Sequence, residues 1–261
     1  MNLQNITNEV IQLARSTGAY LTAEQRSLQR EEIELKSSRN YVTYIDKEAE
    51  RMLVDGLSRI LPEAAFLTEE ETVIYEQREY SWIIDPLDGT TNYVHGDTPY
   101  SVSIALMRES QVILGVVFDP VADQLYVATG NGEATLNGKR LEVSRQASLT
   151  NAYIGFGIPY SLDSRGEAIL TNAMRQFRNC SFRMKGSAAL EICSVAAGIS
   201  DAYFHSGLSP WDVAAGAFIL ECAGGRCSDF SGGDHFLFGK EMVASNGSIH
   251  QEIMQSIISI D

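Results

Sequence analysis

The residues whose types and spacing could do chemistry lie together in one short segment. It reads Asp85-Pro86-Leu87-Asp88-Gly89-Thr90-Thr91-Asn92 and follows directly on the hydrophobic run 82–84. Pro86 fixes its own φ and Gly89 permits a tight turn, so the carboxylates of Asp85 and Asp88 and the amides that follow could face one point. Strand ends are where α/β proteins place their sites. The segment therefore predicts a polar site built on two acids.

Two carboxylates held close together favour a bound metal ion. At a separation of ~4 Å they repel by about 4 kcal/mol at an effective dielectric constant of 20, and a divalent cation removes that repulsion. The competing interpretation is an exposed acidic turn, because the segment has good turn chemistry. Spacing excludes an EF-hand loop, which needs acids at its first, third and fifth positions. A phosphatase with an aspartyl nucleophile needs one residue between its acids where this chain has two, and it stays a minor alternative.

Three separated blocks of the chain resemble the inositol monophosphatase family. They are Phe66-Leu67-Thr68-Glu69-Glu70, the segment 85–92, and Trp211-Asp212-Val213-Ala214-Ala215 leading to Ala223-Gly224-Gly225. The resemblance runs from about Lys36 to Asn246 and includes Tyr41-Val42-Thr43-Tyr44-Ile45-Asp46 and Gly186-Ser187-Ala188-Ala189. The blocks follow one another in the family's order, and this agreement favours the metal site over the acidic turn.

The resemblance implies a fold of the α+β or α/β class, a layered α-β-α-β-α sandwich of the inositol monophosphatase or sugar phosphatase type. It also implies a homodimer that uses two or three Mg²⁺ ions, with Mn²⁺ as a substitute, and that is often inhibited by lithium. The implied activity is hydrolysis of a small phosphate monoester, most directly inositol 1-phosphate, by a metal-activated water.

The same resemblance assigns a role to individual residues of the matching blocks. The implied metal ligands are Glu69, Asp85, Asp88, Asp212 and the backbone carbonyl of Leu87. The implied catalytic residues are Glu69 and Thr90, which would position the attacking water, and Asp46, which would support Thr90. The implied substrate-binding residues are Asp88, Gly89, Thr90, Gly186, Ser187, Ala188, His205 and Asp212. Gly89 and Thr90 would offer backbone amides to the phosphate, while the segment 186–188 would line the side that holds the alcohol.

Two positions depart from the family pattern. His205 stands where inositol-specific animal members use a glutamate to hold the ring hydroxyls, and Thr68 replaces the glycine common before the metal glutamate. A carboxylate accepts hydroxyl hydrogen bonds as an anion, whereas a neutral imidazole offers one donor and one acceptor. The substrate therefore stays open between an inositol phosphate and NADP, fructose 1,6-bisphosphate or an adenosine 3′,5′-bisphosphate. A non-catalytic phosphate-binding regulatory protein is the alternative of another class.

Composition places the chain among soluble globular proteins. The 261 residues are 44% hydrophobic and 21% charged, and the formal net charge is −14. An acidic chain lacks the clustered Lys and Arg that bind phosphate backbones, so we expect a small phosphorylated metabolite as partner and no nucleic acid. The first twenty residues lack the apolar core of a signal peptide, and no run is long enough to cross a membrane. The four cysteines show no ligand spacing, which indicates reduced residues of a cytoplasmic protein.

The pattern of apolar residues predicts the elements that must position these groups. Three-and-four spacing predicts helices at 5–30, 45–60, 164–177, 187–197, 210–222 and 249–258. Short β-branched and aromatic runs predict strands at 80–85, 100–107, 111–118, 124–129, 151–156, 181–184, 201–205, 226–230 and 242–245. Asn137-Gly138 predicts a hairpin over 134–141. We expect two subdomains, 1–145 with most metal ligands and 146–261 with Asp212 and the substrate side.

Overall fold

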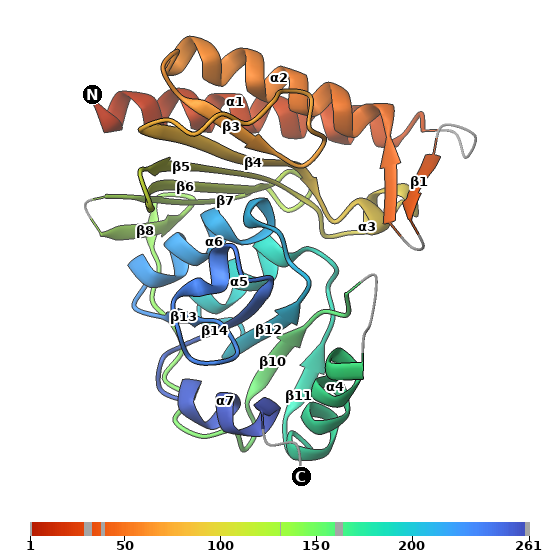
Figure 1. Cartoon of the computed structure of the whole chain (residues 1–261), viewed down its shortest axis with the longest axis vertical. Coiled ribbons are helices and arrows are strands. Elements are labelled where there is room, and N and C mark those ends of the chain that lie inside the picture. Colours follow the sequence, from red (N-terminus) through yellow and green to blue (C-terminus); the bar gives the residue numbers. More distant parts are fainter. Residues whose placement is uncertain (1, 29–32, 38–39, 131, 160–163, 259–261) are drawn as a thin grey trace.

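The structure, a computed structural model, describes residues 2–28, 33–37, 40–130, 132–159 and 164–258. These residues form stacked layers in the order helices, sheet, helices, sheet, helices (Figure 1). The larger sheet has seven strands in the order β3-β4-β5-β6-β7-β8-β9, and the smaller has five in the order β11-β10-β12-β14-β13. The layered α/β arrangement predicted from the sequence is confirmed.

The larger sheet and the helices on its outer face come from the first part of the chain. Its strands are β3 (Ala65–Thr68), β4 (Tyr80–Asp88), β5 (Ser101–Arg108), β6 (Gln111–Asp119), β7 (Gln124–Thr129), β8 (Glu133–Leu136) and β9 (Lys139–Arg140). The outer helices are α1 (Leu3–Gln25) and α2 (Tyr44–Ile60), and the short helix α3 (Thr90–Val94) follows β4. A separate antiparallel pair is formed by β1 (Ile33–Ser37) and β2 (Asn40–Thr43).

The second part of the chain forms the remaining layers. The strands of the smaller sheet are β10 (Tyr153–Phe156), β11 (Ser181–Arg183), β12 (Ala202–Ser206), β13 (Arg226–Ser228) and β14 (Glu241–Ser245). The helices of the middle layer are α5 (Ala188–Ala196) and α6 (Pro210–Cys222), and those beyond the smaller sheet are α4 (Ser164–Gln176) and α7 (His250–Ile258) (Figure 1).

Helix α2 shows why the outer layer forms where it does. Thr43 caps its N-terminus: the Thr43 hydroxyl accepts the Ile45 N–H, and the carboxylate of Asp46 accepts the Thr43 N–H at 2.8 Å. Ile45, Ala49, Leu53 and Leu57 then lie on one buried stripe that packs against β4. The cap and the stripe together fix both the start and the inner face of the helix.

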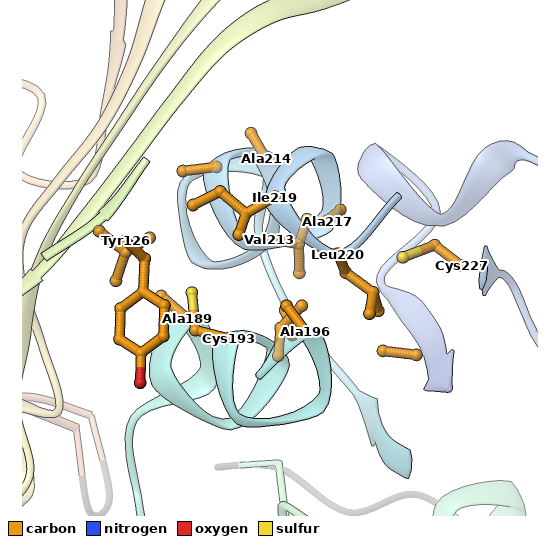
Figure 2. Close-up of a cluster of buried hydrophobic side chains, with 14 of the residues drawn as sticks. Tyr126, Ala189, Cys193, Ala196, Val213, Ala214, Ala217, Ile219, Leu220 and Cys227 are labelled. Carbon is orange, nitrogen blue, oxygen red and sulfur yellow. The ribbon is translucent and has the colours of Figure 1, made fainter. Parts of the chain in front are cut away.

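Helices α5 and α6 are buried over most of their surface because the two sheets cover them on opposite sides. Figure 2 shows their side chains between Tyr126 of β7 and Cys227 of β13. Many of the buried side chains are small: Ala189, Cys193 and Ala196 on α5, and Val213, Ala214 and Ala217 on α6. Small residues let the two helices and both sheets approach closely, so the middle layer joins the two parts of the chain in one core.

Most predicted elements are present, with ends shifted by a few residues. The helix expected over 5–30 ends at Gln25, and the end of its predicted range, from 29 on, lies outside the described residues. The short strands β1, β2 and β3 and the helix α3 were not predicted, because each is too short to show a period.

All four cysteines are free thiols. In the described part of the chain, no helix has the length and apolar character needed to span a membrane. The division into 1–145 and 146–261 stays a prediction.

Candidate active site

A bulge at the end of β4 brings the first two acids together. Side chains alternate across a strand, so residues three apart would normally point to opposite faces. Asp85 pairs with Ser103 of β5 and Asp88 pairs with Ser101, so two residues of β4 stand against one of β5. The Leu87 N–H donates to the Asp85 carboxylate at 2.9 Å and closes this turn. The extra residue turns Asp88 to the side of Asp85, as the proline turn predicted.

Asp212 joins these two acids from the first turn of α6. Ser209 and Asp212 form a capping box, with Ser209 at the N-cap and Asp212 at the third helical position. The Ser209 N–H donates to the Asp212 carboxylate at 2.6 Å, and Pro210 is the first residue of the helix. Carboxylate oxygens of Asp85, Asp88 and Asp212 all lie within 4.8 Å of one another. Three acids from two distant parts of the chain therefore meet at one point.

Glu69 approaches the same point from the end of β3. β3 runs parallel to β4 with Thr68 opposite Ile84, so the residues that follow this pair, Glu69 and Asp85, lie side by side. Glu69 hydrogen-bonds to the carboxyl of Asp85, and its charge raises the pKa of that group. The four predicted carboxylate ligands are thus near one another, with Glu69 beside Asp85.

The electrostatics of the cluster favour a bound cation. Burial, followed by the charges of Glu69, Asp88 and Asp212, holds the pKa of Asp85 well above its usual range. Burial and the Asp88 charge raise the pKa of Asp212 to about 7. Buried like-charged carboxyls either take up protons or bind a cation, and an all-oxygen donor set suits a hard divalent ion such as Mg²⁺. The donor set present therefore fits the metal that the sequence predicted.

The side chains of Thr90 and Asp46 are joined by a hydrogen bond. The Thr90 hydroxyl is 3.3 Å from the Asp46 carboxylate and 3.0 Å from the carbonyl oxygen of Leu87, so one proton is shared between two acceptors. The second carboxylate oxygen of Asp46 accepts from the backbone and the hydroxyl of Thr43, at 2.8 and 2.7 Å. Asp46 thereby holds both the cap of α2 and the hydroxyl of Thr90.

Gly89 is required by close packing at the start of α3. Its φ is +99°, and a Cβ there would lie 3.0 Å from the Pro99 carbonyl oxygen and 3.2 Å from that of Gly186. The side-chain amide of Asn92 donates to Pro99 and, at 2.7 Å, to the carbonyl of Lys185. These contacts bring the turn at 89 against the segment before α5.

The N-terminus of α5 completes the acid cluster on its other side. The carboxylate of Asp88 accepts hydrogen bonds from the Ser187 hydroxyl at 2.5 Å and from the backbone amides of Ala188 and Ala189 at 3.1 and 2.9 Å. Burial raises the pKa of Asp88, and these bonds partly oppose the rise. The helix dipole also favours a negative charge at this end.

A cavity of about 280 Å³ opens beside the acids. Its lining includes Asp88, Gly89, Gly186, Ser187, Ala188, His205 and Asp212, all predicted to bind substrate, together with Tyr203 and Glu191. The lining combines the carboxylates of Asp88 and Asp212 with backbone, aromatic and apolar groups. That arrangement can hold a metal-bound phosphate at the acids and the alcohol portion beyond it.

His205 lies in this cavity as a neutral imidazole. Burial lowers its pKa to about 4. The ring covers Gly157, where a Cβ would overlap the imidazole carbon Cδ2, and its Nδ1 has no hydrogen-bond partner among the described residues. At neutral pH His205 therefore offers one donor and one acceptor rather than a charge.

Sequence reasoning missed two buried glutamates close to the predicted site residues. Glu191 of α5, 2% exposed, accepts the Lys185 N–H at 2.8 Å through Oε1, while its Oε2 has no partner among the described residues. Burial raises the pKa of Glu191 to about 7. Glu50 falls on the apolar stripe of α2 with Leu53 and Leu57. The missed signal in both cases was a charged residue at an apolar position of a helical period.

Known proteins resemble this chain over nearly its whole length. A sequence model described as the inositol monophosphatase family matches residues 2–260. An inositol-1-monophosphatase of Mesorhizobium japonicum is 36% identical over 258 residues, 97% of this chain and 96% of the relative. A protein named Nus factor SuhB of Pseudomonas aeruginosa is 36% identical over 263 residues, 98% and 96% of the two chains. The crystal structure of the extragenic suppressor protein suhB of Bartonella henselae superposes with a TM-score of 0.91 at 31% identity, covering 98% of this chain and 100% of that one.

Proposed function

The chain belongs to the inositol monophosphatase family and is a phosphomonoesterase, and we propose that it hydrolyses inositol 1-phosphate or a similar small phosphate monoester with Mg²⁺. The observation that carries the proposal is the meeting of Asp85, Asp88 and Asp212 within 4.8 Å, where two of these acids, Asp88 and Asp212, line a cavity. A binding protein has no need of three clustered acids beside a glutamate and a threonine, to which we assign the orientation of water.

Metal ions are needed because a general base cannot supply the rate alone. Enzymes accelerate phosphate-monoester hydrolysis by up to ~10²¹, while one positioned base contributes ~10²–10⁴. Mg²⁺ held by Glu69, Asp85, Asp88, Asp212 and the Leu87 carbonyl would supply a water of lowered pKa and neutralise charge on the phosphoryl and leaving oxygens. Two or three ions fit the proposal, and Mn²⁺ would substitute.

The residues of the chain have distinct parts in the proposed reaction. Glu69 and the hydroxyl of Thr90 orient the attacking water, and Asp46 holds that hydroxyl at 3.3 Å. The backbone amides of Gly89 and Thr90 face the phosphate oxygens. The segment 186–188 and His205 line the cavity where the alcohol lies. Holding water and phosphate in one orientation removes most of the entropic barrier.

The cavity supports an alcohol of sugar size but does not discriminate between polyols. A neutral His205 can donate to one hydroxyl and accept from another, and the same pair of hydrogen bonds suits a ribose or a hexose. Inositol 1-phosphate is the first choice because of the family. NADP, fructose 1,6-bisphosphate and adenosine 3′,5′-bisphosphate are the alternatives with the same chemistry.

A substrate panel tests the proposal. The purified chain is incubated with Mg²⁺ and each of the four phosphate esters, and released phosphate is measured, with Asp85→Asn as the inactive control. We expect inositol 1-phosphate to be cleaved fastest, with inhibition by Li⁺. Faster release from another ester would replace the substrate but keep the chemistry. Tight binding of an ester without turnover would support the phosphate-binding regulatory alternative.

The proposed function also bears on what the protein binds and on its oligomeric state. A net charge of −14 disfavours a polyanion such as nucleic acid, so the proposed partner is a small metabolite. We further propose a cytoplasmic homodimer on the basis of the family resemblance. Light scattering of the purified protein would test the dimer directly.

A further inference from the structure

One buried carboxylate outside the acid cluster binds the segment that carries Glu69. Glu50 of α2 is 0% exposed. Its Oε1 accepts the Thr68 hydroxyl at 2.9 Å and the Thr72 N–H at 2.8 Å, and its Oε2 accepts the Glu70 N–H at 2.7 Å. All three donors come from residues 68–72, on either side of Glu69.

The backbone of this segment is shaped around that carboxylate. Glu71 has a φ of +51°, a left-handed conformation that non-glycine residues avoid. It lies between the two amides that donate to Glu50, and its conformation turns both amides toward one carboxylate. Such strain persists only where surrounding contacts hold it. Here the contacts are the hydrogen bonds of Glu50.

We propose that Glu50 is a positioning residue that holds Glu69 beside Asp85 in its metal-binding orientation. The inference rests on the proposed function, since the part of Glu69 there is to bind metal and orient water. Glu69 follows β3 directly, so a carboxylate that anchors the residues before and after it fixes where its own carboxylate can reach. Thr68, which departs from the family glycine, supplies one of the three anchoring bonds.

A neutral amide cannot replace this carboxylate. Two backbone N–H groups and a hydroxyl converge on two oxygens, and Gln would place an NH₂ donor against one of these donors. Glu50→Gln thus removes at least one bond to the segment while nearly preserving size. Thr68→Val removes only the hydroxyl donor and keeps a β-branched residue in β3. Glu48→Gln, an exposed acid of α2 paired with Arg51 at 3.2 Å, is the matched control.

Mn²⁺ binding without substrate gives a readout that does not depend on turnover. The full chain and each variant are titrated with Mn²⁺ and followed by electron paramagnetic resonance, with thermal unfolding as the check of folding. We expect the half-saturating Mn²⁺ concentration to rise ~10–100-fold in Glu50→Gln, as for other residues that orient metal ligands. Thr68→Val should give a smaller rise, and Glu48→Gln none. The amide protons of Glu70 and Thr72 should exchange faster in Glu50→Gln.

The outcomes separate this inference from the proposed function. Wild-type Mn²⁺ binding in both Glu50→Gln and Thr68→Val, in a chain that hydrolyses phosphate esters, overturns the inference and leaves the function standing. If Glu50→Gln fails to fold, weaker binding in folded Thr68→Val supports the inference and unchanged binding overturns it. A wild-type chain that neither binds Mn²⁺ nor releases phosphate overturns both.

Discussion

The carboxylate of Asp88 accepts the backbone N–H of Ala189 at 2.9 Å, although 101 residues separate them along the chain. The acid that ends β4 therefore also lies at the N-terminus of α5. Its second oxygen accepts the Ala188 N–H at 3.1 Å. The helix that borders the cavity and the acids beside it are consequently held in one hydrogen-bonded unit.

Ser187→Ala should weaken the link between Asp88 and α5. The Ser187 hydroxyl caps the helix by accepting the Leu190 N–H at 3.4 Å and donates to Asp88. Losing both should lower the free energy of unfolding by about 1–2 kcal/mol, measured by urea denaturation. Ser256→Ala, a half-buried helical serine whose hydroxyl donates to the Glu252 carbonyl, is the control and should change the free energy of unfolding by less than about 0.5 kcal/mol.

Asp212→Asn should raise the stability of the metal-free protein and lower the stability of the protein with bound Mg²⁺. Without metal, the raised pKa of about 7 means that ionising Asp212 opposes folding as pH rises from the ordinary 3.8 through 7. At pH 8 the variant should therefore be more stable than wild type, by up to about 4 kcal/mol, because a charge that is buried and lies beside Asp88 is removed. With Mg²⁺ it should lose the stabilisation that the ion gives to wild type, and phosphatase activity should fall at least about 100-fold. Calorimetric scans with EDTA and with Mg²⁺ measure both. A metal-free variant less stable than wild type would count against the repulsion.

Substitutions of His205 should separate hydrogen bonding from packing. His205→Leu fills similar space without donor or acceptor, so KM for the preferred ester should rise about tenfold, the effect of one lost hydrogen bond. His205→Gln keeps one donor and one acceptor and should stay closer to wild type. Steady-state kinetics with both variants decide the point. Wild-type KM values in both variants would show that His205 does not contact the alcohol.

Gly115→Ala should push α6 away from the larger sheet. A Cβ at this position of β6 would lie 2.8 Å from the backbone oxygen of Ala215, which cannot move without the helix. Overpacking of this kind costs about 1–3 kcal/mol of unfolding free energy, and because α6 carries Asp212, Mn²⁺ binding should weaken as well. Gly130→Ala is the control, since its nearest neighbours are 3.7 Å away.

His250 should make the fold sensitive to acid. The residue is 1% exposed, and its ring bridges the hydroxyls of Ser228 and Ser245 at 2.9 and 2.8 Å. Burial lowers its pKa to about 4, below the ordinary 6.5, so the stability it contributes is complete above pH 6.5 and is lost as pH falls toward 4. Between pH 7 and pH 4 the loss should be roughly 3 kcal/mol. His250→Gln, which stays neutral, should lack this part of the loss in urea denaturation. Parallel pH profiles for the two proteins would contradict the assignment.

Local features of the sequence determined the elements and the acid segment. Apolar spacing placed α2, α5 and α6, and the residues between Asp85 and Asp88 predicted the turn that gathers the two acids. Capping chemistry is equally local, because Ser209, Pro210 and Asp212 begin α6 within four residues. The order of the matching blocks predicted the family and its layered fold. Each of these depends on residues close together in the chain or on a pattern that a single strand or helix displays.

Only the tertiary structure decided which distant side chains meet. Asp212 reaches Asp85 because Gly115 lets α6 lie close to the sheet, and Asp88 reaches α5 because Asn92 and Gly89 bring two loops together. The hydrogen-bonding roles of Glu50 and Glu191 could not be predicted for the same reason. Their partners lie at least six residues away in the chain and outside their own helices. Periodicity reports which face of an element is buried. The partner of a buried charge is set by packing between elements, which no local pattern encodes.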